Sequence, residues 1–156
     1  MSEPSAKSVV VSLLARCDKS CSALRQQLLD KEFAEAEVDE AIEWAQTLGY
    51  LDDKRLAEAI LRSQLNRLHG PAKIEQTMQQ KGIAKSLATE VIAAAEVDWF
   101  TLAEQRAQKK FSSLAFSRHD YPLLQKQKAK VIRHLLGQGF SFEQAGFALE
   151  ACMVDE

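Results

Sequence analysis

Apolar side chains recur three to five positions apart along most of the chain, the spacing that places them on one face of an α-helix. The clearest stripe consists of Leu56, Ile60, Leu61, Leu65 and Leu68. Runs in which polar and apolar residues alternate, as they do in half-buried β-strands, are absent from the sequence. The pattern therefore predicts an all-α protein.

Glycine, proline and aspartate mark the helix ends near the middle of the chain. Gly49 follows a periodic segment and is expected to close its helix in the left-handed conformation. Asp52 or Asp53 is expected to cap the next helix, because a short carboxylate side chain accepts hydrogen bonds from free backbone N–H groups. Gly70 is expected to end that helix and Pro71 to begin the following one. This segment is therefore predicted to hold two helices joined by a very short connection.

Three other helix starts carry a recognisable cap. Ser20 is placed to cap a helix that begins near position 21, and Asp98 to cap the helix that contains Trp99. Ser141 and Gln144 have the spacing of a capping box, in which each side chain bonds to the other residue's backbone N–H.

The apolar positions repeat along the chain. Leu24, Leu28, Phe33 and Ile42 align at an offset of 50 with Ile74, Met78, Ile83 and Ile92. The same four residues align at an offset of 107 with Val131, Leu135, Phe140 and Leu149. A further helix precedes each set, over residues 6–17, 52–68 and 98–112. The sequence therefore predicts about nine helices in three tandem three-helix repeats.

The boundaries of these repeats are predicted at residues 1–50, 51–97 and 98–156. Because units of a tandem array pack mainly against their neighbours, we expect an elongated and curved molecule. A stretch rich in serine, near residues 112–121, is expected to be a flexible linker. Phe116 and Tyr121 are candidates for exposed contacts there.

Charge is distributed unevenly, although the whole chain has a net charge of only −2. The net charge is −4 over residues 1–50, +1 over 51–97, +5 over 98–139 and −4 over 140–156. A basic block therefore lies between acidic ends. Such a block attracts phosphate groups or an acidic protein surface through Coulomb forces that salt weakens.

The basic residues of the central and C-terminal parts are the candidates for binding DNA phosphates or an acidic protein surface. They are Arg55, Arg62, Arg67, Lys73, Arg106, Lys109, Lys110, Lys126, Lys130 and Arg133. The alternative is that these side chains only solvate the polar faces of helices. Aromatic residues suited to base stacking are sparse, so sequence-specific binding of single strands is not expected.

No motif for catalysis or for a cofactor is present, so we expect a protein that is not an enzyme and needs no cofactor. Cys17 and Cys21 are four residues apart, but no second ligand pair accompanies them, so we do not expect a metal site. His69, His119 and His134 are expected at the surface. The sequence has no apolar run of membrane-spanning length and no signal peptide, which predicts a cytoplasmic protein, and we expect a monomer.

Four linked elements in the middle of the chain resemble the RecX family of bacterial RecA regulators. They are Gly49-Tyr50-Leu51-Asp52-Asp53, then Arg55-Leu56-Ala57, then Gly70-Pro71 with Ile74, and finally Lys81-Gly82-Ile83. Leu56 replaces the phenylalanine that is usual in the family, and Met78 replaces leucine, but both keep an apolar side chain in the core. The resemblance covers about residues 12–150.

The resemblance implies a fold of tandem three-helix repeats and a non-enzymatic regulator that binds the RecA filament. It implies that the protein dampens recombination, ATP turnover and the co-protease activity that triggers the SOS response. Single- or double-stranded DNA is expected to bind weakly. Two other functions fit the residues, namely a direct DNA-binding protein built from trihelical modules and a helical-repeat scaffold for another protein partner.

Overall fold

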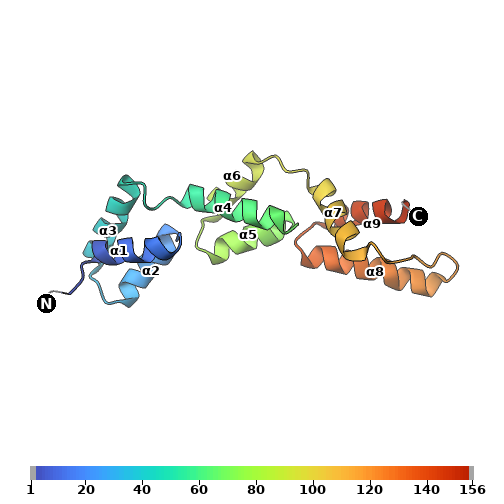
Figure 1. Cartoon of the computed structure of the whole chain (residues 1–156), viewed down its shortest axis with the longest axis horizontal. Coiled ribbons are helices and arrows are strands. Elements are labelled where there is room, and N and C mark those ends of the chain that lie inside the picture. The colour runs from blue at the N-terminus through green and yellow to red at the C-terminus, as the bar shows by residue number, and fades with distance from the viewer. Residues whose placement is uncertain (1–2, 155–156) are drawn as a thin grey trace. The chain divides into compact units, whose positions relative to one another are not determined.

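The computed structural model describes residues 3–154, and within them every regular element is an α-helix (Figure 1). The helices are α1 (Ala6–Arg16), α2 (Cys21–Asp30), α3 (Glu35–Thr47), α4 (Asp53–Asn66), α5 (Pro71–Gln80), α6 (Lys85–Ala94), α7 (Trp99–Phe111), α8 (Tyr121–Gly137) and α9 (Phe142–Val154). The predicted all-α class is confirmed. None of these helices is long and apolar enough to cross a membrane.

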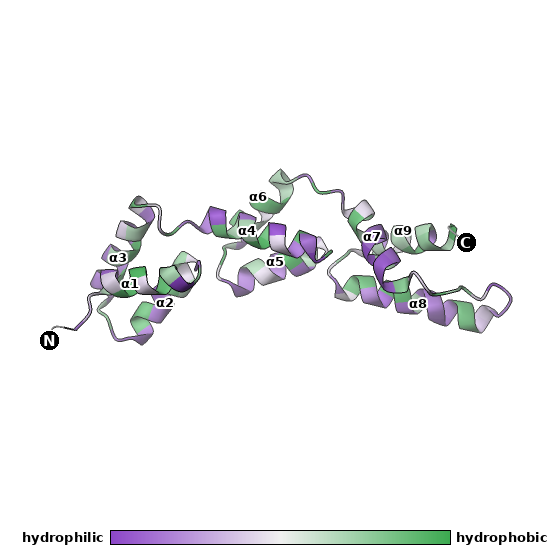
Figure 2. Cartoon of the chain, viewed as in Figure 1, coloured by the Kyte–Doolittle hydropathy of each residue, from purple (hydrophilic) through white to green (hydrophobic). Residues whose placement is uncertain are grey.

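The chain forms two compact units. The N-terminal unit runs to Ile60 and also includes Thr77–Val91, whereas the C-terminal unit comprises Leu61–Gln76 and the chain from Ile92 onward. The core of the N-terminal unit includes Val10, Leu24, Leu28, Val38 and Ala45. The core of the C-terminal unit includes Ala103, Ala107, Phe111, Val131, Leu135 and Phe140. Hydrophobic and hydrophilic residues alternate around individual helices, as an amphipathic pattern requires (Figure 2).

The repeat detected in the sequence recurs in the backbone of the turns after α2, α5 and α8. Glu32, Gly82 and Gly139 have positive φ angles of 69°, 89° and 96°, and they are separated by the offsets of 50 and 107. The residue after each one donates a backbone hydrogen bond to the carbonyl five positions earlier, at 2.9–3.3 Å. These are helix C-terminal motifs built around a left-handed residue. The tandem three-helix repeat is therefore confirmed.

The turn at Gly82 packs tightly against the start of α2 inside the N-terminal unit. The Ser22 hydroxyl donates to the Gly82 carbonyl at 3.0 Å, and a Cβ added at Gly82 would come within 2.3 Å of the Ser20 Oγ. The Cys21 amide donates to the Asp53 carboxylate at 2.8 Å, which links the start of α2 to the start of α4. Close packing explains why glycine is needed here beyond its φ angle.

The turn at Gly139 packs in a comparable way against the start of α5 inside the C-terminal unit. The Gly70 amide donates to the Gln138 carbonyl at 2.7 Å, and the Ala72 amide donates to the Gly139 carbonyl at 3.0 Å. A Cβ added at Gly70 would lie 2.3 Å from the Gly139 carbonyl carbon. The Gly70 amide before α5 and the free Ala72 amide in its first turn are thus satisfied by a later segment of the chain.

The role predicted for Gly70 as the end of α4 is wrong. Leu68, with φ 59°, is the left-handed residue after α4, and Gly70 instead permits close backbone contact with the Gly139 turn. Pro71 begins α5 as predicted. The sequence pattern predicted the connection between α4 and α5 correctly. It did not predict why glycine is required there, because the close contact is with a segment about 70 residues away.

The predicted helix caps are present. Gly49 has φ 77°, and the Asp52 carboxylate accepts from the Lys54 and Arg55 amides at 3.1 and 3.2 Å. Ser20 accepts from the Ala23 amide at 3.1 Å, and the Ser141 and Gln144 side chains form both bonds of the capping box. Asp98 caps α7, and hydrogen bonds from Thr101 lower the pKa of its carboxyl.

The segment between α7 and α8 is hydrogen-bonded to α8. The Gln127 side chain accepts from the Ser117 amide at 2.9 Å and donates to the Ala115 carbonyl at 2.9 Å. The expected exposure of Phe116 is wrong, because its side chain is buried in the core of the C-terminal unit, whereas Tyr121 is 71% exposed. Flexibility over residues 112–121 stays a prediction.

Candidate functional site

Four of the predicted basic residues gather around two histidines in the C-terminal unit. Arg67 and His69 follow α4, Lys73 lies in the first turn of α5, Arg106 and Lys110 lie on α7, and His134 lies on α8. We call this set the basic cluster. Hydrogen bonds from Arg106 join α7 to α8 and to the segment after α4, and the charge of Lys73 on α5 lowers the pKa of both imidazoles.

Arg106 joins the elements of the basic cluster. Its Nε donates to the Nε2 of His134 at 3.1 Å, and its Nη1 donates to the Arg67 carbonyl at 3.3 Å. The first bond requires an unprotonated Nε2, so the neutral imidazole carries its proton on Nδ1. The Phe111 ring meets the His134 ring edge-on, with 5.4 Å between the ring centres. The guanidinium is therefore held in one place by two acceptors.

His69 is held by a buried amide. Its Nδ1 donates to the Oε1 of Gln64, because an amide oxygen can only accept, and its backbone N–H donates to the Gln64 carbonyl at 3.1 Å. Gln64 is only 8% exposed. A polar side chain buried to this degree is normally fully hydrogen-bonded, so the Gln64–His69 pair fixes the turn between α4 and α5.

Burial and neighbouring cations keep both imidazoles neutral. Burial lowers the pKa of His69, and the charges of Lys73, Arg106 and Arg67 lower it further. Burial likewise lowers the pKa of His134, with added effects from Arg106, Lys110 and Lys73. Like charges close together disfavour a further proton. The cluster therefore concentrates positive charge that its own histidines do not increase at neutral pH.

This arrangement is suited to binding an anion. Arginine offers a planar set of N–H donors to phosphate or carboxylate, and lysine offers a mobile ammonium group. Several cations clustered in one place raise the local concentration of anionic partners and speed their association. Phosphate groups of DNA or carboxylates of a protein surface would meet these requirements.

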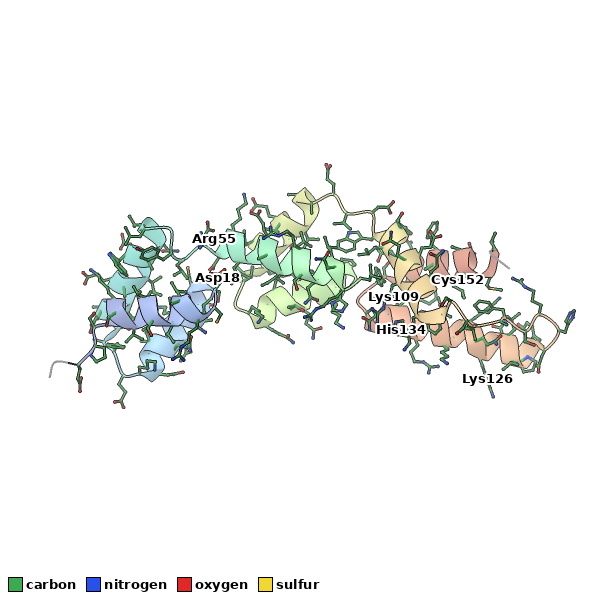
Figure 3. The ribbon with its side chains drawn as sticks, viewed as in Figure 1. Asp18, Arg55, Lys109, Lys126, His134 and Cys152 are labelled. Atoms are coloured by element: carbon green, nitrogen blue, oxygen red, sulfur yellow. The ribbon has the colours of Figure 1, made fainter. Side chains whose placement is uncertain are left out.

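The other predicted residues lie outside the basic cluster. Arg55 belongs to the N-terminal unit and donates to the Gly49 carbonyl at 3.1 Å. The side chains of Arg62 on α4, Lys109 on α7, and Lys126, Lys130 and Arg133 on α8 are exposed. Figure 3 shows Lys126 and His134 toward opposite ends of α8. Lys130 and Arg133 lie between these two positions, so positive charge extends along the middle of the helix.

Part of that charge lies on an extension that is specific to the third repeat. The offset of 107 from Cys21 would start the helix at position 128, but α8 begins at Tyr121, seven residues earlier. Asp120 caps the extension by accepting from the Leu123 amide at 3.1 Å, and the extension carries Lys126. α8 is consequently longer than α2 and α5 and displays more surface.

The two histidines of the basic cluster were not among the site residues predicted from the sequence. His69 and His134 were expected at the surface, but both are half-buried, whereas His119 is exposed as expected. His134 continues the Lys126–Lys130–Arg133 stripe by one position, which turns its ring toward α7. The one available signal was that His69 lies between Arg67 and the Gly70-Pro71 joint.

The cysteines do not form a reactive pair. Burial and the negative charge of Asp53 raise the pKa of the Cys21 thiol to about 11, which keeps the thiol protonated at neutral pH. Cys17 is exposed and unbonded to another cysteine. Between residues 3 and 154, no three His, Cys, Asp or Glu residues are grouped as ligands for a metal ion.

Known proteins match this chain over nearly its whole length. A family model described as the first three-helix domain of RecX matches residues 6–44, and one described as the second matches residues 52–92. A Regulatory protein RecX from Vibrio parahaemolyticus is 35% identical over 145 residues, which cover 93% of this chain and 90% of that protein. One from Haemophilus influenzae is 32% identical, covering 86% of each chain.

A solved structure shares the fold. The crystal structure of RecX from Lactobacillus salivarius superimposes with a TM-score of 0.82, at 18% sequence identity, and covers 96% of this chain and 95% of the other. At that identity the structural similarity establishes only the fold, whereas the sequence matches establish membership of the family.

Proposed function

Since this chain belongs to the RecX family of regulatory proteins, we propose that it binds the RecA nucleoprotein filament and limits its recombinase, ATPase and co-protease activities. The observation that carries the proposal is the basic cluster, together with the exposed cations of α8. A filament of recombinase on DNA offers phosphates and acidic side chains over a long surface, and clustered cations are suited to both.

The supporting geometry concerns Arg106 most directly. Two acceptors of the chain itself, the His134 Nε2 and the Arg67 carbonyl, orient its guanidinium in the absence of a partner. A preorganised donor loses less conformational entropy when a ligand arrives. The lysines of α8 act at longer range, because exposed charges steer an approaching partner more than they fix it.

Direct coating of DNA is the second candidate function, and the same cations favour it. The acidic net charge of the first 50 residues and of the last 17 opposes a protein whose main partner is naked DNA. Binding to DNA alone is therefore expected to be weaker than binding to the filament. A scaffold function for an unrelated partner has no specific support from the basic cluster.

The test is a titration of RecA ATP turnover on single-stranded DNA with this protein. We expect ATP turnover to be lost at a molar ratio well below one protein per recombinase monomer, because a regulator of a filament needs to act at only a few sites. Binding to the same DNA without RecA is measured in parallel by fluorescence anisotropy. Loss of turnover only at concentrations that coat the DNA would favour the DNA-binding function, and undiminished turnover would contradict the proposal.

A further inference from the structure

Two aromatic side chains form an exposed pair on α7 and α9 of the third repeat. Phe100 of α7 and Phe147 of α9 meet edge-to-face, with ring centres 5.4 Å apart and an angle of 81° between the rings. They are 40% and 45% exposed, although each has the other as a neighbour. Large aromatic side chains that stay this exposed are typical of surfaces that bind a partner.

Acidic side chains surround the aromatic pair. Glu104 lies one turn after Phe100 on α7, while Glu143 and Glu150 lie one turn before and after Phe147 on α9, on the same sides of their helices. Within the described residues, neither Glu143 nor Glu150 forms an ion pair. Glu104 accepts only a long bond, 3.4 Å, from the Gln108 amide. The carboxylates are thus available to an external cation.

The surface next to Phe147 is open. Gly146 lies beside it in α9, and a Cβ added there would meet nothing within 4 Å. Phe142, at the start of the same helix, is 70% exposed. An aromatic pair beside an uncovered helix backbone leaves room for another polypeptide to approach α9 closely.

We propose that Phe100 and Phe147, with Glu104, Glu143 and Glu150, form a docking surface for a protein segment that carries an apolar side chain flanked by lysine or arginine. The charge decides the class of partner, because α9 carries Glu143 and Glu150 and no lysine or arginine. This surface repels nucleic-acid phosphate and attracts a basic polypeptide. Buried aromatic anchors with a charged rim are the usual composition of a protein interface.

The inference rests on the proposed function for the identity of that protein, which is the recombinase. The third repeat would then have two chemically different surfaces. The basic cluster and α8 would face phosphates or carboxylates of the filament, and the aromatic surface would hold a basic segment of a recombinase subunit. Dual recognition of this kind would distinguish a filament from naked DNA, which has no apolar, basic polypeptide to offer.

Photo-cross-linking tests the docking surface directly. A benzophenone amino acid replaces Phe147 in one protein and Tyr50 in another, and each is irradiated with RecA filaments on single-stranded DNA. Tyr50 is the matched control, because it is 50% exposed and pairs edge-to-face with Trp44 in the first repeat. We expect the probe at 147 to give at least about fivefold more adduct with RecA than the probe at 50. Equal adducts, adducts with DNA, or adducts between two copies of this chain would overturn the proposal.

Substitution supplies an independent measurement. Phe100→Gln with Phe147→Gln should raise the concentration that halves ATP turnover by about tenfold, as should Glu143→Lys with Glu150→Lys. Tyr50→Gln should leave it unchanged, and circular dichroism melting would show that each variant folds. If wild-type protein does not inhibit the filament, the proposed function fails. If the wild-type protein inhibits and all three variants inhibit as strongly as it does, only the docking surface is refuted.

Discussion

Glycine at position 139 meets two separate requirements, and they differ in energetic consequence. Its φ of 96° disfavours any side chain, and a Cβ there would lie 2.4 Å from the Lys73 amide nitrogen. Gly49 has a similar φ of 77° but no atom within 4 Å of an added Cβ. The pair therefore separates conformational strain from steric overlap.

We expect Gly139→Ala to destabilise the protein much more than Gly49→Ala. The left-handed conformation alone costs a non-glycine residue about 1–2 kcal/mol, and overlap with the backbone of α5 adds a similar or larger amount. Urea denaturation followed by circular dichroism gives both free energies of unfolding. Equal losses in the two variants would show that the α5 start and the Gly139 turn are not in close contact.

His69 and His134 make stability depend on pH in a defined direction. Burial and the neighbouring cations lower the pKa of both imidazoles in the folded protein, so the unfolded chain binds protons more readily. The free energy of unfolding should therefore be greatest above the ordinary histidine pKa of about 6.5 and should decrease as pH falls through that value.

Replacing both residues tests this dependence. The variant His69→Gln with His134→Gln should lose less stability between pH 7.5 and 5.5 than wild type, as measured by urea midpoints. The control is His119→Gln, which changes an exposed histidine outside the basic cluster and should keep the wild-type pH slope. A double variant with an unchanged slope would assign the acid sensitivity to other groups.

At the scale of helices, the sequence predicted most of the fold, because the ends of a helix are determined by residues close to them in the sequence. Ser20, Asp98 and the Ser141–Gln144 box each act within three residues, so the pattern of a short window is sufficient. The repeat could also be predicted, because Leu24, Ile74 and Val131 occupy equivalent core positions. Contacts between segments that are distant in the sequence could not be predicted in this way.

The basic cluster illustrates that limit. Arg67 and Arg106 are 39 residues apart, and the hydrogen bond that joins them depends on how α7 packs near the end of α4. The sequence named Arg67, Lys73, Arg106 and Lys110 as separate candidates but gave no reason to group them with His69 and His134. It also expected Phe116 to be exposed, because a serine-rich segment resembles a loop even where one aromatic side chain enters the core.

The segment between α7 and α8 gives a prediction at this scale. Hydrogen exchange should protect the Ser117 amide, which bonds to Gln127, more than the amides of Ser112 and Ser113. Gln127→Ala removes both side-chain bonds and should raise the exchange rate of the Ser117 amide by roughly fivefold, since one lost hydrogen bond is worth about 1 kcal/mol. The exchange of Ala107 in the middle of α7 should not change. Fast exchange throughout residues 112–121 in wild type would instead indicate the flexible linker that the sequence predicts.

For the whole molecule, the uneven distribution of charge is the feature most closely tied to the proposed regulation. The acidic first repeat lowers the attraction of naked DNA, whereas residues 98–139 carry a net charge of +5. Lys126, Lys130 and Arg133 are exposed on α8, and their spacing of four and three residues places them on one face of that helix. A partner drawn by the basic block would therefore meet α8 along much of its length.

Reversing these three charges should weaken inhibition of the RecA filament. We expect Lys126→Glu, Lys130→Glu and Arg133→Glu in one protein to raise the concentration that halves ATP turnover by at least about tenfold near 0.1 M salt, because steering by clustered charge changes association by this order. The difference from wild type should shrink as salt increases, since exposed charges are screened beyond about 10 Å. A protein with Lys19→Glu, Lys31→Glu and Lys54→Glu has the same net charge change and serves as the control. If that control loses as much activity as the α8 variant, total charge governs the interaction and α8 has no specific role in it.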